Sequence, residues 1–143
     1  MRDSFRFQDL ECWKHARKLA CFIYNVSKNE RLNNDSWLAS EIQSAALTVM
    51  STIAEGAAWN SDIEFAGFLE FSRSALVELQ NYVFIALDLG YIKEKQFREF
   101  LNQANSTAVI INELIKYLRD KSDKRADQIE KSESEKERER TLN

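Results

Sequence analysis

The chain has 143 residues and a net charge of −3, with no proline, three glycines, one histidine and two cysteines. Proline and glycine mark turns and end helices, so a chain nearly free of them has few turns and long elements. β-Sandwiches, β-barrels and doubly wound sheets, which need turn residues about every 8–12 residues, are therefore excluded.

The first predicted helix covers residues 9–27, with Asp9 as its N-cap. Its apolar residues span an arc of about 200°, which is wider than the stripe that one buried face needs. Residues 27–36 are polar and are expected to form the longest loop of the chain.

The second helix is expected over residues 37–55, where apolar side chains recur at helical spacing. Either Asp35 or Ser36 supplies its N-cap, because both side chains can accept a hydrogen bond from a free backbone N–H. Gly56 is expected at the C′ position, where glycine adopts the left-handed conformation that ends a helix.

The third helix has the clearest start signal of the chain. Ser61 followed by Glu64 matches a capping box, and Gly90 is expected to end the helix. The fourth helix begins near Lys93, which is a poor cap residue, and its apolar periodicity continues to Leu118. The connections on both sides of the third helix are short.

Together these helices predict an all-α, antiparallel up-and-down four-helix bundle over residues 1–121. Residues 122–143 form a charged tail. We expect this tail to be either a frayed extension of the fourth helix, held by charge pairs, or a disordered segment.

The sequence predicts no catalytic or metal chemistry. A di-iron bundle needs two Glu-x-x-His pairs, and His15 is the single histidine. Cys12 lies three residues before His15, but these two ligands fall short of the three or four that zinc requires. We therefore expect no metal, no cofactor and no enzymatic activity.

The two cysteines indicate a reducing compartment. Cys12 and Cys21 are nine residues apart on one predicted helix, about half a turn apart around its axis, and cannot bridge each other. Residues 1–9 lack the apolar segment of a signal peptide, and no stretch of about 20 apolar residues occurs. A cytoplasmic protein with reduced thiols and no membrane association is expected.

Three charged residues lie inside or beside the apolar seams. Arg17 falls within the apolar arc of the first helix, while Glu55 and Glu78 flank the seams of the second and third. A structural ion pair among them would explain these positions, because an unpaired buried charge is costly. Alternatively, Arg17 extends its stem across the edge of the core and keeps its charge in water.

Several apolar side chains point away from the predicted core. Val77, Phe84 and Ile85 lie on the outer side of the third helix, and Phe22 lies on the outer side of the first. Apolar residues gathered on the same faces indicate a contact surface. We expect these four residues to form an oligomer interface.

Four short motifs occur in the order typical of one known family. Residues 7–13 read Phe-Gln-Asp-Leu-Glu-Cys-Trp, residues 53–56 read Ile-Ala-Glu-Gly, residues 68–79 contain Phe-Leu, Ser-Arg-Ser and Glu-Leu, and residues 89–92 read Leu-Gly-Tyr-Ile. Over residues 5–118 the chain resembles the four-helix-bundle family encoded in intervening sequences of bacterial 23S rRNA genes, often called ribosomal-protein-like.

This resemblance implies a non-enzymatic bundle that assembles into a ring, commonly a homopentamer. Similar proteins include the accessory factor of diversity-generating retroelements, a basic pentameric barrel that binds reverse transcriptase and nucleic acid. The resemblance therefore implies a second copy of the chain as one partner, and protein or nucleic acid as further partners.

The chain departs from the family in its second helix. Gln43 and Ser44 stand where the family has two arginines, and Met50 stands where it has a proline. The loss of two positive charges weakens phosphate contacts, because each neutralised phosphate contributes to affinity by counterion release. Without the proline, the helix is expected to be straighter.

Two hypotheses for function follow. The first is a self-assembling scaffold or adaptor for a protein partner. The second is an RNA- or DNA-associated protein that uses basic residues of the helices: Lys14, Lys18, Arg73, Lys116 and Arg119. Against the second hypothesis, these cations are better explained as ordinary solvated charges.

Overall fold

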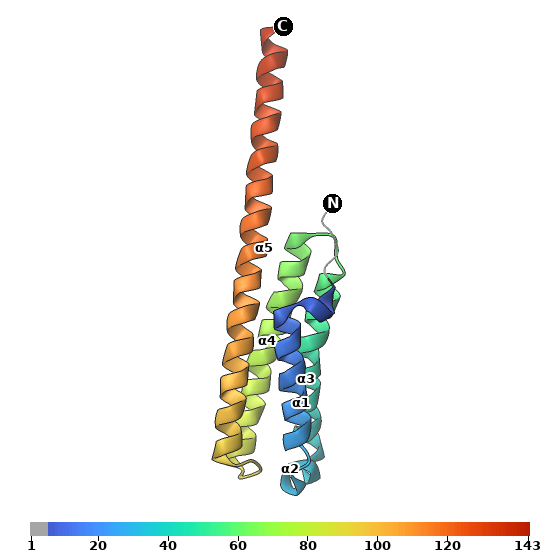
Figure 1. Cartoon of the computed structure of the whole chain (residues 1–143), viewed down its shortest axis with the longest axis vertical. Coiled ribbons are helices and arrows are strands. Elements are labelled where there is room, and N and C mark those ends of the chain that lie inside the picture. The colour runs from blue at the N-terminus through green and yellow to red at the C-terminus, as the bar shows by residue number, and fades with distance from the viewer. Residues whose placement is uncertain (1–5) are drawn as a thin grey trace.

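The computed structural model describes residues 6–143, which form helices joined by short turns, with no strand among them. In chain order the elements are a 3-10 turn η1 (Phe7–Asp9), α1 (Glu11–Val26), α2 (Glu30–Asn34), α3 (Ser36–Ala57), α4 (Asp62–Asp88) and α5 (Glu94–Leu142) (Figure 1). The predicted all-α class is confirmed. Residues 1–5 lie outside the described residues. The first five residues of the predicted bundle, and most of the segment in which we expected no signal peptide, are therefore not described.

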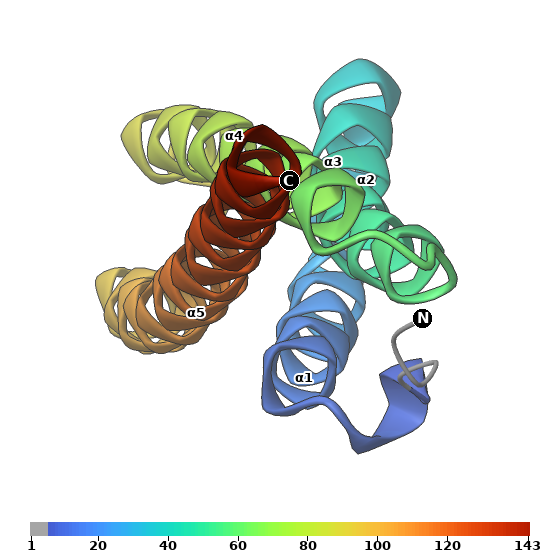
Figure 2. The same ribbon diagram turned by 90° about the horizontal axis from the view of Figure 1, so that it is seen from above.

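Successive long helices run in alternating directions along one axis (Figure 1). α3 packs against α1 and α4, and α5 packs against α4 and α1. This order places α1 and α4 diagonally across the core, as the view from above shows (Figure 2). The side of the molecule between α1 and α5 is therefore distinct from the outer face of α4.

The buried seam of α4 has heptad spacing. Its members alternate at four and three residues and are all buried: Phe65, Leu69, Ser72, Leu76, Leu79, Val83 and Ala86. This spacing keeps a single stripe of the helix facing the core. The one polar member, Ser72, donates a hydrogen bond of 2.7 Å to the carbonyl oxygen of Val49 and so ties α4 to α3.

Gly56 packs α3 closely against α4 and does not end α3. The helix continues to Ala57, and Gly56 is buried within it. A Cβ at this position would lie 2.7 Å from Cβ of Phe68 and 2.8 Å from Cδ1 of Phe65. The predicted C′ role is therefore wrong, because the glycine is needed for close approach of two helices.

Two further boundaries differ from the prediction. α1 begins at Glu11 after η1, so Asp9 is not its N-cap. Residues 27–36 are not simply a loop, because α2 lies within them and buries Leu32 in the core. One buried side chain in a five-residue helix leaves no periodic pattern in the sequence.

Other helix ends agree with their sequence signals. Asp35 Oδ1 accepts a hydrogen bond of 3.2 Å from the Leu38 N–H, and Ser61 Oγ accepts one of 3.3 Å from the Glu64 N–H. Gly90 has a φ of 72° just beyond α4, the left-handed conformation expected where a helix ends. Turn chemistry thus fixes the start of α3 and both ends of α4.

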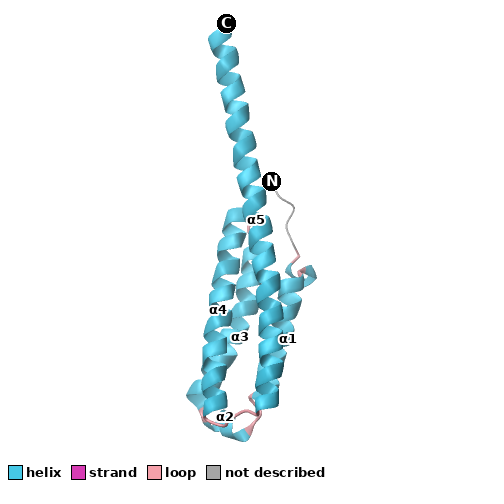
Figure 3. Cartoon of the chain, turned by 90° about the vertical axis from the view of Figure 1, so that its left-hand side faces the viewer, coloured by secondary structure: helices cyan, strands magenta, loops and turns pink. Residues whose placement is uncertain are grey.

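The charged tail, residues 122–143, continues α5 as a helix to Leu142 (Figure 3). Lys121 Nζ lies 3.6 Å from the carboxylate of Asp62 at the start of α4. From Asp123 onward every residue is exposed. The last part of α5 therefore extends beyond the other helices and takes no part in the core.

Candidate interaction surfaces

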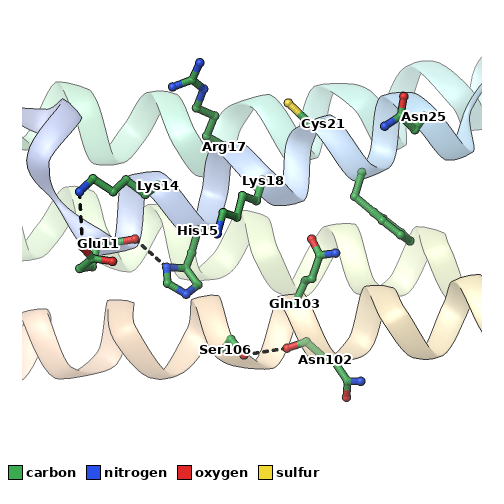
Figure 4. Close-up of a pocket in the computed structure, with 11 residues that line it drawn as sticks. Glu11, Lys14, His15, Arg17, Lys18, Cys21, Asn25, Asn102, Gln103 and Ser106 are labelled. Atoms are coloured by element: carbon green, nitrogen blue, oxygen red, sulfur yellow. Dashed lines mark hydrogen bonds and ion pairs between the residues drawn. The ribbon is translucent and has the colours of Figure 1, made fainter.

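A groove of about 880 Å³ lies between α1 and α5 (Figure 4). α1 supplies one wall and carries the charged and apolar side chains, while Asn102, Gln103 and Ser106 of α5 supply the other. We call this the α1–α5 groove. The residues of its α1 wall are Glu11, Lys14, His15, Arg17, Lys18, Cys21, Phe22 and Asn25.

The α1–α5 groove is positively charged. Lys14 Nζ lies 3.4 Å from the carboxylate of Glu11, the acidic side chain of the groove. The Arg17 guanidinium lies 5.6 Å from the centre of the Trp13 ring, a cation–π contact. Lys18 forms no ion pair within the described part of the chain. The α1 wall of the groove therefore carries three cations and one carboxylate.

Gln103 leaves one hydrogen-bond acceptor of the groove unused. Its Oε1 atom is buried and has no hydrogen-bond partner among residues 6–143. Buried polar atoms in folded proteins nearly always have a partner, because an unsatisfied one loses its hydration without compensation. The α5 wall of the groove thus holds one buried acceptor that is unpaired within the described part of the chain.

The outer face of α4 is a second surface with an unusual composition. Ile63 is 67% exposed and Phe71 72% exposed, and Val77 and Ile85 continue the exposed apolar stripe. A depression of about 540 Å³ lies at Gly67 and is lined by Glu64, Gly67, Phe68, Glu70, Phe71 and Ser74. We call this depression the Gly67 notch.

The predicted interface residues fall on different surfaces. Val77 and Ile85 are exposed on the outer face of α4. Phe84 is 46% exposed, but its ring packs edge-on against Phe97 of α5 at 4.7 Å between centroids. Phe22 is half-buried and lines the α1–α5 groove. The structure therefore does not bring all four together within one chain.

Sequence reasoning missed Ile63, Phe71 and Gly67 on the same face. Ile63 lies 14 residues before Val77, and Phe71 lies 6 residues before it. At 100° per residue, the three side chains fall within an arc of about 120° around the helix axis, which places them on the same side of α4. Extending the helical-wheel argument along the whole of α4 would have found them.

The predicted structural ion pair is not formed. Arg17, Glu55 and Glu78 are all exposed, and no ion pair within the described residues joins Arg17 to either glutamate. α1 packs mainly against α3 and α5, so the edge of its wide apolar arc stays open to solvent. The expectation that these charges are buried together is wrong for the single chain.

Glu78 has a different partner. It accepts a hydrogen bond of 2.7 Å from the Tyr82 hydroxyl, one turn along α4. This bond to a carboxylate stabilises the protonated phenol and raises the pKa of Tyr82 to about 12. Glu78 therefore remains an exposed negative charge on α4.

The five candidate nucleic-acid contacts form two groups. Lys14 and Lys18 line the α1–α5 groove. On the side between α4 and α5, Arg119 and Arg73 both pair with Glu70, and Arg73 also donates a hydrogen bond of 2.8 Å to Asn112. Lys116 is exposed three residues before Arg119. Glu70 thus partly neutralises the second group.

The cysteines differ in environment, and both are free. Cys12 is 1% exposed, and burial raises the pKa of its thiol to about 11, whereas Cys21 is exposed in the α1–α5 groove. Residues 6–143 contain no cluster of three side chains that could hold a metal ion. No helix in that range is long and apolar enough to cross a membrane.

These observations define an all-helical protein whose candidate site is a pair of surfaces on the helices. Comparison with known families gives the particular assignment: the chain belongs to the 23S rRNA-intervening sequence protein family, which matches residues 8–113. The family resemblance found in the sequence motifs is therefore confirmed.

One solved structure similar to this chain is the crystal structure of a protein of unknown function from the S23 ribosomal protein family of Bacteroides thetaiotaomicron VPI-5482. The two share 18% sequence identity with a TM-score of 0.67, over 73% of this chain and 98% of the other. At this identity the likeness shows a common fold. No curated protein matches the chain in sequence.

Proposed function

We propose that this protein is a non-enzymatic, self-assembling scaffold or adaptor, in which antiparallel four-helix bundles close into a ring of five copies. The observation that supports it most is the outer face of α4, where Ile63, Phe71, Val77 and Ile85 are exposed and no other helix among the described residues covers them. Several exposed apolar side chains on one face of a helix typically mark a contact site.

Burial of this face would favour association. Burial of one large apolar side chain contributes about 1.5–3 kcal/mol. Association costs at least about 4 kcal/mol in lost translational and rotational freedom. The four side chains are 48–72% exposed, so their burial offsets a larger part of that cost than a single exposed side chain could.

The proposed setting is the cytoplasm, with a protein partner besides the second copy. Cys12 and Cys21 are both free thiols, which is the usual state of cysteines in a reducing compartment. The fold supports an adaptor role, because a ring of bundles would leave the free end of α5 available beyond the helical core.

Val77→Glu tests self-assembly on this face. We expect the variant to lose mass in light scattering at micromolar concentration while keeping its helical circular dichroism, because Val77 is exposed in the single chain. Phe84→Glu should also dissociate the ring, but Phe84 packs on Phe97, so its effect includes damage within the chain. Ser51→Glu, exposed on α3, is the control. A native chain that is monomeric at micromolar concentration would rule out the proposal.

A second candidate function is association with RNA or DNA. Lys14, Arg17 and Lys18 together in the α1–α5 groove favour it, because clustered cations attract phosphates. Glu70 weakens it by pairing with Arg73 and Arg119.

Binding of structured RNA at two salt concentrations tests this second function. We expect affinity to fall steeply between low and moderate salt, and Lys14→Glu with Lys18→Glu to weaken binding and reduce the salt slope by about one per lysine. Absence of any mobility shift by the native chain would exclude the function.

A further inference from the structure

Gly67 has no structural reason to be a glycine within the described part of the single chain. It lies in the interior of α4 with a helical backbone, and a Cβ built on it would meet nothing within 4 Å among residues 6–143. Glycine inside a helix costs about 1 kcal/mol relative to alanine. Gly56, by contrast, is needed because Phe68 and Phe65 would collide with a side chain there.

The surroundings of Gly67 form a notch that a neighbouring molecule could fill. Phe68 and Phe71 wall the notch, and Ser74, seven residues on from Gly67, continues it along the same stripe of α4. Phe71 is the most exposed aromatic side chain among the described residues. Small residues between large apolar ones let another element approach the helix closely.

We propose that the outer face of α4, centred on the Gly67 notch, docks along the α1–α5 groove of a second copy of this chain. The inference rests on the self-assembly proposed above and identifies the two faces that meet. α4 would lie as a ridge in the groove between two helices, and the notch would receive a side chain that projects from the groove.

Charge complementarity favours this pairing. α4 has five acidic residues, of which Asp62 is buried beside Lys121 and Glu70 pairs with Arg73 and Arg119. The exposed negative charges of this helix are therefore Glu64, Glu78 and Asp88, and its one basic residue, Arg73, is held by Glu70 and Asn112. The α1–α5 groove has the opposite sign, with Lys14, Arg17 and Lys18 on its α1 wall. Opposite potentials steer encounter and fix register, whereas two α4 faces in contact would repel each other.

The second copy also provides partners that the single chain lacks. Arg17 and Glu78 are exposed and separate in one chain, yet they lie on the two faces that would meet.

The geometry of this contact is head-to-tail. The α1–α5 groove and the outer face of α4 lie on different sides of the molecule, because α1 and α4 are diagonal across the core. Each bound copy therefore leaves one groove and one α4 face free for the next copy. When such a contact is repeated, it generates a closed ring if the rotation that relates neighbouring copies is a whole fraction of 360°.

Crosslinking between Ser74→Cys and the native Cys21 tests the inference. Cys21 lies in the groove and is exposed, whereas Cys12 is buried and should not react. With a short bismaleimide linker we expect a ladder of covalent multimers that ends at the size of the whole ring. Cys21→Ser should abolish the ladder, since each link joins residue 74 of one copy to residue 21 of the next.

Gly67→Leu provides a second measurement. We expect it to lower the mass of the assembly while keeping full helical circular dichroism, because leucine favours helices and the position is open in the single chain. Ser51→Leu on the exposed side of α3 is the matched control and should keep the native mass.

A charge swap gives a third measurement. The double variant Arg17→Glu, Glu78→Arg should retain more assembly than either single variant.

Two results would overturn the inference and leave self-assembly intact. One is an oligomer of the Ser74→Cys variant that gives no link between positions 21 and 74, and the other is an assembly whose mass is unchanged by Gly67→Leu. A crosslinked dimer that persists in Cys21→Ser would place two α4 faces together and would also overturn it. A monomeric native chain would instead remove the proposed function together with this inference.

Discussion

Gly56 and Gly67 both lie inside helices, but only Gly56 is explained by packing within the chain. The Cβ of an alanine at position 56 would sit 2.7 Å from Cβ of Phe68, whereas one at position 67 would meet nothing within 4 Å in the described chain. Phe65, whose Cδ1 would lie 2.8 Å from the alanine Cβ at position 56, is fully buried and has no room to move aside. Substitution of Gly56 therefore reports the cost of packing a side chain between α3 and α4, and substitution of Gly67 reports helix propensity alone.

We expect Gly56→Ala to lower the free energy of unfolding by about 1–3 kcal/mol, the usual cost of overpacking a core. Gly67→Ala should raise it by up to about 1 kcal/mol at concentrations where the chain is monomeric, because only helix propensity changes there. Denaturant titrations of both variants measure these effects. Equal effects of the two substitutions would contradict the packing role of Gly56.

The thiol of Cys12 predicts a loss of stability at alkaline pH. Burial raises its pKa from 9.0 to about 11, so the folded chain keeps the proton that the unfolded chain releases. The unfolded state then binds fewer protons than the folded state, and stability falls as pH rises through this window. Below pH 9 the contribution of Cys12 is fully present.

The measurement is the free energy of unfolding of the native chain minus that of Cys12→Ala as a function of pH. This difference should be constant below pH 9 and should fall by about 2 kcal/mol by pH 11. Lysine and tyrosine titrations are common to both proteins and cancel. A difference that does not change with pH would show that the thiol is accessible to water.

At the scale of elements, α5 combines two environments in one helix. Phe97, Phe100, Ala104, Ile111 and Leu118 are buried, while every residue from Asp123 to the end is exposed. A helix that is polar all round depends on charge pairs between its own side chains, each contributing about 0.2–0.5 kcal/mol. The two halves should therefore differ greatly in local stability.

Hydrogen exchange of the full chain tests this difference. Amides of residues 124–142 should exchange at least about 100-fold faster than those of residues 100–118, since local opening costs far less than global unfolding. Similar protection in both halves of the isolated monomer would contradict the division of α5. Protection of the tail that appears only at high concentration would assign it to the assembly.

The sequence predicts elements whose signals are local. The α4 seam from Phe65 to Ala86 and the caps at Asp35 and Ser61 follow from spacing and turn chemistry over a few residues. α2 could not be predicted, because its anchor is the single buried residue Leu32. Gly56 was misassigned because a helix-ending glycine and a close-packing glycine look alike until the neighbouring helix is placed.

The candidate site was less predictable than the fold, because it depends on which helices are neighbours. The α1–α5 groove joins residues about 80 positions apart, and no local pattern links Lys18 to Gln103. The angle of Arg17 on α1 falls among apolar residues and allowed two positions, a buried ion pair or a stem across the core edge with the charge in water. The open edge of α1 exposes it, and this follows only from the packing order of the helices.

For the molecule as a whole, the faces left open by the packing order determine its expected behaviour. The core is shared by four long helices, and the exposed apolar residues of α4 and the cationic groove of α1 and α5 lie outside it. The described surface thus carries two unlike faces with opposite charge. A chain with this arrangement is suited to repeated head-to-tail contact with its own copies.

The molar mass of the full native chain in solution tests this conclusion most directly. Light scattering across micromolar concentrations should give one discrete species with a mass near five times the 16.7 kDa of the chain. In the proposed assembly burial of the α4 face drives association, and such a species should withstand moderate salt. A mass of 16.7 kDa at every concentration would contradict self-assembly.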